Sequence, residues 1–587
     1  MNINQSWFEM LDLRKKNLDN SVWIPLRSEK VIRNGRSGFL GYQEEFFGSG
    51  SIMISKKDKT YSKHLNWMDI GIMPIHNSSF NDGQYLPSDI YNSGDNDFKG
   101  INLILNQSFD NNYDLNEWHL HQDLIISLGL KREGDIWICP QEGYIEVAKL
   151  ERDEEGSPIV LLIKNQFLKD YLCARDCGLY VSSYYSREYI HNETSTLSWK
   201  EKSKNEKKGK DLWECRIMEI HEGGFPFGQK IAISHVGRTD IFENEDIPDI
   251  SKFPTDDNVK SEFYEKEFKG KKLYRIMSEL WKYDWINPAK RSPIVLGHKD
   301  QTKIYFITDA EGKKKSGDSL VNGGKWLWFK PDLAINLLSK RGSNLTWYTQ
   351  DTGSISCGPN GGIHFGLNEL GFITIYAKDM SYLPVWQQQI WAGFNISPEG
   401  GISKELHDSQ IKAEPAPTLA PENFLGSVIE DLNNEFTKQF GFKLFREHLS
   451  VKEILPTINR FRAIDKKGLF SLAKDIARVI IDDINTEEIQ KIAVPPKDTK
   501  WGSLKTIENL LSLKIKEEYA RKMLSPIVGI YELRHGDAHL PSSDIDSSFD
   551  LVGVDRNSPY INQGFQMLYA CIDHLHMILS VINKWNN

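Results

Sequence analysis

Apolar residues in the last third of the chain recur at intervals of three and four positions. Five of them fall on one side of a single helix and form the first stripe, which consists of Leu425, Val428, Ile429, Leu432 and Phe436. Comparable stripes follow over residues 469–480, 503–524, 525–540 and 560–582. We therefore predict a bundle of about five or six helices over residues 422–587.

The chain before residue 411 has a different pattern, in which short apolar runs alternate with turn-forming residues. Such runs are typical of β-strands, and they occur at residues 135–140, 144–150, 303–309, 325–329 and 372–377. Helical spacing interrupts them at residues 166–177 and 332–340. The predicted fold class is thus multidomain, with an α+β, β-rich N-terminal region followed by an all-α helical bundle.

Changes in composition suggest where the domains divide. Residues 411–421 contain three prolines, and proline fixes φ and removes a hydrogen-bond donor, so this stretch predicts a stiff extended linker. The basic stretch at residues 199–210 predicts a solvated loop. The expected division is an α+β domain at residues 1–198, a β-rich α+β domain at 199–410, the linker at 411–421 and the helical domain at 422–587.

Length and charge limit the function classes. A chain of 587 residues is too long for one core and predicts about three to four domains. The formal net charge of −9 argues against bulk, non-specific binding of nucleic acid or of membranes. The first residues lack the apolar core of a signal peptide, and no run of about 18 apolar residues occurs, so we expect a cytoplasmic protein without a membrane span.

A polar cluster ends the helix that the sequence predicts from Ser525 and Pro526, a serine cap followed by proline at the first helical position. After Leu533 the sequence reads Arg-His-Gly-Asp-Ala-His over residues 534–539. Leu540 and Pro541 then end the predicted helix.

Two residues of this cluster combine the chemistry that phosphodiester cleavage needs. His539 can take and give a proton near neutral pH. Arg534 offers a fixed planar cation that stabilises charge on phosphoryl oxygens. Neither role requires a metal or another cofactor, and we expect none. A two-fold axis would bring two copies of the pair together.

Arg534, the polar His535 directly after it and His539 five positions after Arg534, late in an all-helical domain, resemble the signature of HEPN ribonucleases. The resemblance covers roughly residues 422–587. It implies a small helical bundle that dimerises, with two motifs forming one metal-independent RNase site in which the 2′-hydroxyl attacks the adjacent phosphate. A HEPN domain after a β-containing region also resembles ApeA-type anti-phage defence proteins, which implies a regulated toxin or defence effector.

The resemblance also implies roles for single residues. Arg534 and His539 would be catalytic, while His535, Asp537 and Glu532 would support them by orienting the site. RNA would be the substrate, and the helical domain would form a homodimer or higher oligomer. The first 410 residues would sense a trigger or restrain the nuclease, because a free RNase would poison its host.

Two interpretations without catalysis stay open. A histidine in the last turn is favoured by the helix dipole, and Arg534 with Asp537 can form an ordinary i,i+3 surface pair. The bundle could also be a HEPN-like module that binds RNA or a partner, or mediates dimerisation, with an inert cleft.

A second enzyme class is a kinase. The sequence His-Gly-Asp-Ala-His at residues 535–539, followed by Asp555, resembles the catalytic loop and metal-binding aspartate of aminoglycoside phosphotransferase-like kinases. Asp537 would then be the catalytic base. That family has asparagine where this chain has Ser542, and residues 421–524 predict helices in place of the expected strands and glycine-rich turn.

Metal sites are not expected. On a continuous helix Asp537 would point roughly 200° away from His535 and from His539, from ~100° per residue. The six cysteines form no CxxC pair, and Cys173 and Cys177, four apart, lack a second pair, so buried thiols in a reducing compartment are expected.

Basic loops offer weaker candidates for contacts to the RNA backbone. They carry Lys207, Lys208, Lys210, Lys313, Lys314 and Lys315.

Overall fold

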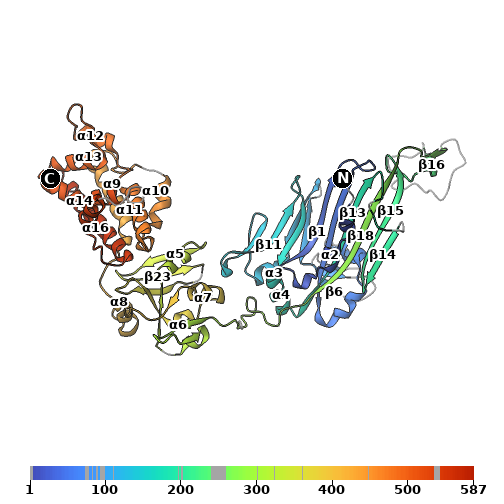
Figure 1. Ribbon diagram of the computed structural model, residues 1–587, viewed down its shortest axis with the longest axis horizontal. Coiled ribbons are helices and arrows are strands. Elements are labelled where there is room, and N and C mark those ends of the chain that lie inside the picture. The colour runs from blue at the N-terminus through green and yellow to red at the C-terminus, as the bar shows by residue number, and fades with distance from the viewer. Residues whose placement is uncertain are drawn as a thin grey trace. The chain divides into compact units, whose positions relative to one another are not determined.

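The structure is a computed structural model. It describes residues 4–72, 79–81, 84–86, 90–92, 99–109, 112–195, 197–199, 203–238, 259–299, 302–322, 324–359, 361–446, 449–534 and 543–586. The chain forms two compact units: an N-terminal unit of Met1–Cys139 and Ile145–Lys299, and a C-terminal unit of Pro140–Tyr144 and Asp300–Asn587 (Figure 1). Antiparallel sheets dominate up to Ile396 and helices dominate from Lys404, which confirms the predicted fold class.

The N-terminal unit is built on one antiparallel sheet, twelve-stranded in the described residues. Its order is β14-β15-β18-β13-β2-β1-β12-β11-β10-β9, and β6, which pairs with β5, joins at β2. In β18, every second residue from Ile276 to Ile286 is buried, as expected when one face of a strand packs on a core. The strands are β1 (Trp23–Asn34), β2 (Gln43–Ser55), β5 (Ile90–Asn92), β6 (Lys99–Ile101), β9 (Lys131–Glu133), β10 (Ile136–Cys139), β11 (Ile145–Arg152), β12 (Pro158–Lys164), β13 (Cys177–His191), β14 (Ser203–Lys208), β15 (Asp211–His221) and β18 (Lys272–Ile286).

The predicted domain boundary at residues 198/199 falls inside this sheet. β18 pairs with β13 on one side and with β15 on the other, so strands before and after residue 199 share one ladder. The basic stretch expected to be a loop contains the edge strand β14, whose six residues are all exposed. The pairing of β18 with β13 and β15 joins residues far apart in the chain, so no local sequence pattern reveals it. The charged residues of β14 are typical of an exposed edge strand.

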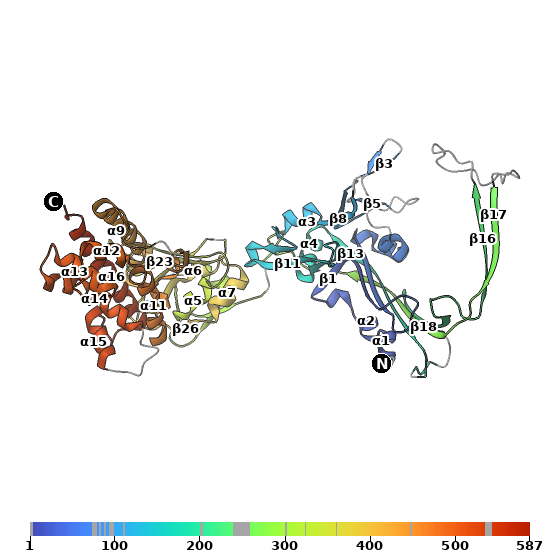
Figure 2. The ribbon, with the colours of Figure 1, turned by 90° about the horizontal axis from the view of Figure 1, so that it is seen from above.

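Smaller elements complete the N-terminal unit. Helix α4 (Asn165–Ala174), helix α3 (Gln122–Ser127) and the hairpin of β7 (Ile104–Phe109) and β8 (Asn112–Leu120) contribute side chains to one hydrophobic core. A second hairpin, β16 (Lys230–Arg238) with β17 (Val259–Glu267), extends away from the large sheet (Figure 2). The expected strands at residues 135–140 and 144–150 correspond to β10 and β11, and the helix expected at 166–177 corresponds to α4.

The C-terminal unit begins with a smaller antiparallel sheet of order β22-β23-β24-β25-β21-β26. Helix α5 (Asp332–Leu338) buries Leu333, Ala334 and Leu337 in the core of this sheet. Strands β21 and β25 and helix α5 lie where the sequence predicts them, and β19 (Tyr305–Ile307) lies in the stretch 303–309. The sheet strands are β21 (Trp326–Phe329), β22 (Ser343–Trp347), β23 (Thr352–Cys357), β24 (Ile363–Leu367), β25 (Ile373–Tyr376) and β26 (Asn395–Ile396).

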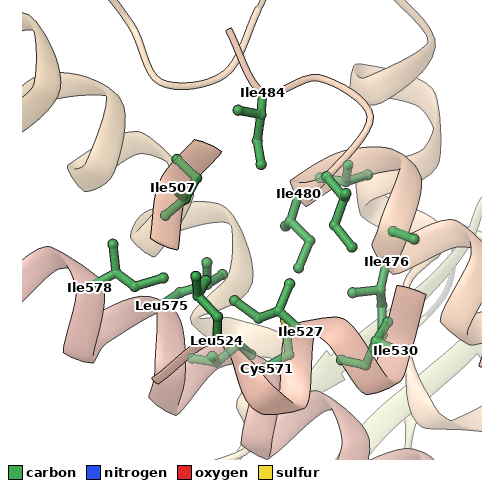
Figure 3. Close-up of a cluster of buried hydrophobic side chains, with 14 of the residues drawn as sticks. Ile476, Ile480, Ile484, Ile507, Leu524, Ile527, Ile530, Cys571, Leu575 and Ile578 are labelled. Carbon is green, nitrogen blue, oxygen red and sulfur yellow. The ribbon is translucent and has the colours of Figure 1, made fainter. Parts of the chain in front are cut away.

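The helical bundle follows in the same unit. Its core gathers isoleucine and leucine side chains from several helices, including Ile476, Ile480, Ile527, Ile530 and Leu575 (Figure 3). α14 packs against α11, α13, α15 and α16 and is therefore central. The helices are α9 (Leu425–Phe440), α10 (Leu449–Ile454), α11 (Lys466–Ile480), α12 (Thr486–Ile492), α13 (Ser503–Ser512), α14 (Glu517–Leu533), α15 (Ser543–Val552) and α16 (Tyr560–Ile582).

The predicted helix start at Pro526 is wrong. α14 begins at Glu517, nine residues earlier, and Pro526 lies inside it. Proline inside a helix removes one backbone hydrogen bond, and this cost usually ends or kinks the helix. Here Pro526 is buried and the helix continues through it, so tertiary packing overrides the local signal.

α16 is long and apolar enough to cross a membrane, by length and composition alone, although no such stretch was expected. Many of its side chains are buried in the bundle, among them Met567, Leu568, Cys571 and Ile582. It packs against α9, α11 and α14, as the core helix of a bundle does. This composition is weak evidence for a membrane span.

The stretch predicted to be a linker joins the small sheet to the bundle. Residues 413–420 are irregular, as proline predicts, but Ala420 is 1% exposed and Pro421 is buried. Just beyond, the side chains of Glu422 and Arg460 form an ion pair that is 5% and 2% exposed, respectively. We call this pair, together with Trp347 and Phe461, the junction. The linker therefore does not separate two independent domains.

Three side-chain hydrogen bonds and an aromatic ring hold the guanidinium of Arg460 in the junction. Arg460 donates to Glu422 from Nε and Nη2, both at 2.8 Å, and from Nη1 to the carbonyl of Gln350 at 2.8 Å. Its guanidinium lies 4.2 Å from the Trp347 ring centroid, and Trp347 stacks on Phe461 at 5.5 Å. A two-pronged, charge-assisted geometry of this kind compensates the desolvation of both ions.

Replacing Arg460 with methionine should destabilise the C-terminal unit by roughly 3–5 kcal/mol, because Glu422 would be left as a buried, unpaired charge. Urea unfolding, combined with hydrogen exchange of peptides from α9 and β24, measures the effect. Arg556→Met is the matched control, since Arg556 is 46% exposed and its partners Asp546 and Asp550 are 69% and 71% exposed, so these pairs are worth at most about 1 kcal/mol. Equal stability of the two variants would contradict a structural role for the junction.

A pair of carboxylates lies beside the junction. Glu405 accepts hydrogen bonds from Thr349, from Thr418 and from the backbone N–H of Asp351, at 2.6, 2.7 and 2.9 Å. Burial, with the nearby charge of Glu405, raises the pKa of Asp351 to about 6, although Arg460 acts in the opposite direction. The folded unit therefore holds a proton on Asp351 more tightly than the unfolded chain does.

The stabilising contribution of Asp351 should be full below its unfolded pKa of 3.8 and disappear as the pH rises through about 6. Asp351→Asn should accordingly raise the urea midpoint of the C-terminal unit at pH 7.5, and the difference from the wild type should vanish near pH 4. Asp408→Asn is the control, because its ion pair with Lys412 lowers the pKa of Asp408 and removal should give no gain. A lower midpoint for Asp351→Asn at pH 7.5 would refute this account.

Candidate functional site

The structure places two of the five predicted site residues. Glu532 and Arg534 lie at the end of α14. His535, Asp537 and His539 lie in residues 535–542, outside the described part of the chain, so their positions stay predictions. Residue 543, where α15 begins, is again described.

Arg534 is the C-cap of α14 and is held in a defined orientation. Its backbone N–H donates to the carbonyl of Ile530 at 3.2 Å, which continues the helical pattern by one residue. Its Nη1 lies 2.7 Å from Asp482 Oδ1, and its Cζ lies 4.0 Å from the Tyr531 ring centroid. The side chain is 18% exposed, so part of the cation still reaches solvent. A carboxylate and an aromatic face thus fix a partly accessible guanidinium.

The turn after α11 supplies the partner of Arg534. Asp482 is 47% exposed, and its backbone carbonyl accepts a hydrogen bond from Arg446 Nη2 at 2.7 Å. The backbone N–H of Arg446 donates to the carbonyl of Asp483 at 2.8 Å. Two arginines from distant segments therefore meet at one turn. Sequence inspection missed Arg446 and Asp482, because no local spacing links residues 36 and 52 positions apart in the chain.

Glu532 connects the two helices that flank residues 535–542. Its Oε2 accepts a hydrogen bond from Ser548 Oγ of α15 at 2.8 Å. Nearby, Gly529 allows α14 and α15 to approach closely, since a Cβ there would lie 2.7 Å from the Ser548 carbonyl oxygen and 2.6 Å from Val552 Cγ2. The two helices are thus locked together next to Arg534.

The candidate lysines divide between the two units. Lys207 and Lys208 are exposed on the edge strand β14. Lys210 differs, because its ammonium lies over the rings of Tyr180 and Tyr283, at 5.3 and 4.7 Å, and donates to the carbonyl of Leu65. The ammonium of Lys210 is therefore engaged in contacts within the unit, which makes Lys210 a poor candidate for binding RNA.

The second lysine cluster lies in the C-terminal unit. Lys313 is 72% exposed and pairs with Glu311 at 2.9 Å. Lys314 and Lys315 belong to the short strand β20 (Lys314–Ser316), where Lys314 is exposed and Lys315 half-buried. Both Lys313 and Lys314 are accessible to a polyanion.

The described residues contain no group of three or more histidine, cysteine or acidic side chains that could hold a metal. All six cysteines are free thiols. Cys139, Cys215, Cys357 and Cys571 are buried as expected, and burial raises the pKa of the Cys571 thiol to about 12, which keeps it protonated.

Comparison with protein-family models, with curated proteins and with solved structures gave no match to this chain.

Proposed function

We propose that the helical part of the C-terminal unit is a metal-independent endoribonuclease of HEPN type. The observation that carries this proposal is the placement of Arg534, a partly exposed guanidinium fixed at the end of a central bundle helix and directly followed by the segment that bears His539. The proposal also draws on the resemblance of Arg534, His535 and His539 to the HEPN signature.

In this proposal Arg534 binds the scissile phosphate and stabilises the charge that builds up on its equatorial oxygens. Asp482 and Tyr531 restrict the guanidinium, so little conformational freedom is lost when RNA binds. His539 transfers the protons, taking one from the attacking 2′-hydroxyl or giving one to the departing 5′-oxygen. His535 and Asp537 orient these groups.

A second copy of the chain completes the site. One copy supplies one arginine and one histidine, whereas general acid–base catalysis at a phosphodiester uses both a proton donor and a proton acceptor. A two-fold axis through the helical domain would provide both. We therefore propose a homodimer or higher oligomer, with RNA as substrate.

The remaining β-rich region restrains or triggers the nuclease. An unregulated RNase would destroy its host's RNA, so the activity of the proposed nuclease has to be controlled. A toxin or an anti-phage defence effector in the cytoplasm, released by a trigger that the N-terminal region senses, fits these requirements.

The kinase alternative receives less support. It needs a sheet that covers nucleotide phosphates upstream of residue 535. The described residues 421–446 and 449–534 form helices, with one isolated bridge between Phe445 and Ile484. A non-catalytic bundle that binds RNA or a partner is the stronger competitor, and Lys313 and Lys314 would serve it equally well.

The test compares RNA cleavage in EDTA by the wild type, Arg534→Ala and His539→Ala. We expect each variant to lose about 10²–10³-fold in rate, the usual effect of removing a group that stabilises the transition state. Arg521→Ala is the matched control, because Arg521 lies on the same helix, is 64% exposed and pairs in the described residues with Glu508 and Glu517, so it should retain full activity. Growth inhibition on expression provides a second readout for a restrained enzyme.

Binding measurements separate the nuclease from a non-catalytic module. His539→Ala should still bind RNA in a mobility-shift assay while failing to cut it. Cleavage and toxicity that are indifferent to both Arg534→Ala and His539→Ala would refute the nuclease proposal and leave the binding module or the kinase.

A further inference from the structure

The N-terminal unit contains a cavity of about 360 Å³, separate from the candidate site in the helical bundle. It lies between the β7–β8 hairpin, helix α3 and the β9–β10 edge of the large sheet, and its volume falls within the range of small-ligand sites, roughly 300–1,000 Å³. Its lining consists of Leu105, Asn106, Gln107, His119, Leu120, Gln122, Ile125, Arg132 and Trp137.

One wall of the cavity is flat and aromatic. The guanidinium of Arg132 lies over the Trp137 ring, with Cζ 4.7 Å from the ring centroid, and Trp137 itself is buried. A planar cation fixed on an indole can receive a flat ring on its opposite face, as guanidinium planes do with nucleobases. Leu105, Leu120 and Ile125 supply apolar contacts around this wall.

A second wall offers amide and imidazole groups. His119 Nε2 lies 3.0 Å from Gln107 Oε1, which can only accept, so Nε2 carries the hydrogen. His119 Nδ1 is then an acceptor, which suits Arg132 Nη1 at 3.5 Å. The Gln107 amide nitrogen keeps its donors for a ligand. Asn106 precedes Gln107 in β7 and pairs with the buried Trp118, so its side chain lies on the opposite face of the hairpin, where its buried Oδ1 has no hydrogen-bond partner among the described residues.

The charges around the cavity balance. Arg152 donates to both oxygens of Glu117 at 2.9 Å and to Asp135 at 2.8 Å, and Arg132 also pairs with Glu117. Burial opposes ionisation of Glu117, but hydrogen bonds from Arg132 and Arg152 lower its pKa below the usual range. The hydrogen bond from Arg152 likewise lowers the pKa of Asp135. Two cations therefore face two anions at neutral pH, and no surplus positive charge remains for a phosphate.

We propose that this cavity binds a neutral nucleobase, either free or as a nucleoside. Such a ligand has a flat face for the Arg132 wall and in-plane acceptors for the amide of Gln107, a side chain type that pairs with base edges. The balanced charge favours nucleosides over nucleotides. The inference concerns the N-terminal unit and does not rest on the proposed nuclease activity.

Isothermal titration of the full-length protein with adenosine, guanosine, cytidine, uridine and adenine, and with adenosine monophosphate and triphosphate, tests the proposal. At least one neutral ligand should bind with one site per chain, and its affinity should fall as phosphates are added. Saturation-transfer NMR on the wild type extends the range to millimolar affinity. Absence of binding by every neutral member in both experiments would overturn the proposal, as would tighter binding of the phosphorylated forms.

Two neighbouring residues of α3 provide a matched pair of variants. Ile125 lines the cavity, whereas Ile126 is 69% exposed and lies outside its lining. Ile125→Phe should fill the cavity and weaken binding by at least about tenfold, and Ile126→Phe should leave it unchanged. Gln107→Met, at an exposed rim position, should weaken binding without a folding defect. Equal affinity of all three variants and the wild type would place the ligand elsewhere and overturn the assignment.

Discussion

The buried ion pair of Arg460 and Glu422 is the constraint on which the C-terminal unit depends. Two opposite charges that are 2% and 5% exposed cannot be separated without stranding one of them in an apolar setting. Arg460 belongs to the turn before α11, Glu422 follows the proline-rich stretch, and Gln350, whose carbonyl accepts the third hydrogen bond, lies between β22 and β23. The sheet, the irregular stretch and the bundle are therefore held as one unit.

This constraint extends to the candidate site through α11. The helix starts a few residues after Arg460, and its last turn leads to Asp482, the ion-pair partner of Arg534. α11 has fifteen residues and is therefore about 22 Å long, and it spans the distance between the junction and the turn next to the guanidinium of Arg534. α11 therefore connects the junction to the turn that carries Asp482 and so orients Arg534.

Local sequence patterns predicted the positions of many helices and strands, but they did not predict which distant segments pair or pack together. The three-and-four spacing located α9, α11 and α16, and apolar runs located β10, β21 and β25, because each pattern reports one periodicity. The start of α14 was misplaced, since the cost of Pro526 is met by packing that no local window contains. The boundary at residue 199 failed for a related reason, because β18 joins strands from both sides of it. Arg534 was proposed as a site residue from its neighbours in sequence, whereas Asp482 and Arg446 come close to it only after folding.

The chemistry of the RNA ends tests the central claim most directly. An RNA that the protein cleaves in EDTA should yield fragments with 2′,3′-cyclic phosphate and 5′-hydroxyl ends, because the 2′-hydroxyl is the nucleophile. A single 2′-deoxy substitution at the cleaved position should then abolish cutting there. Fragments with 5′-phosphate and 3′-hydroxyl ends, or undiminished cutting at the deoxy position, would contradict metal-independent cleavage by Arg534 and His539.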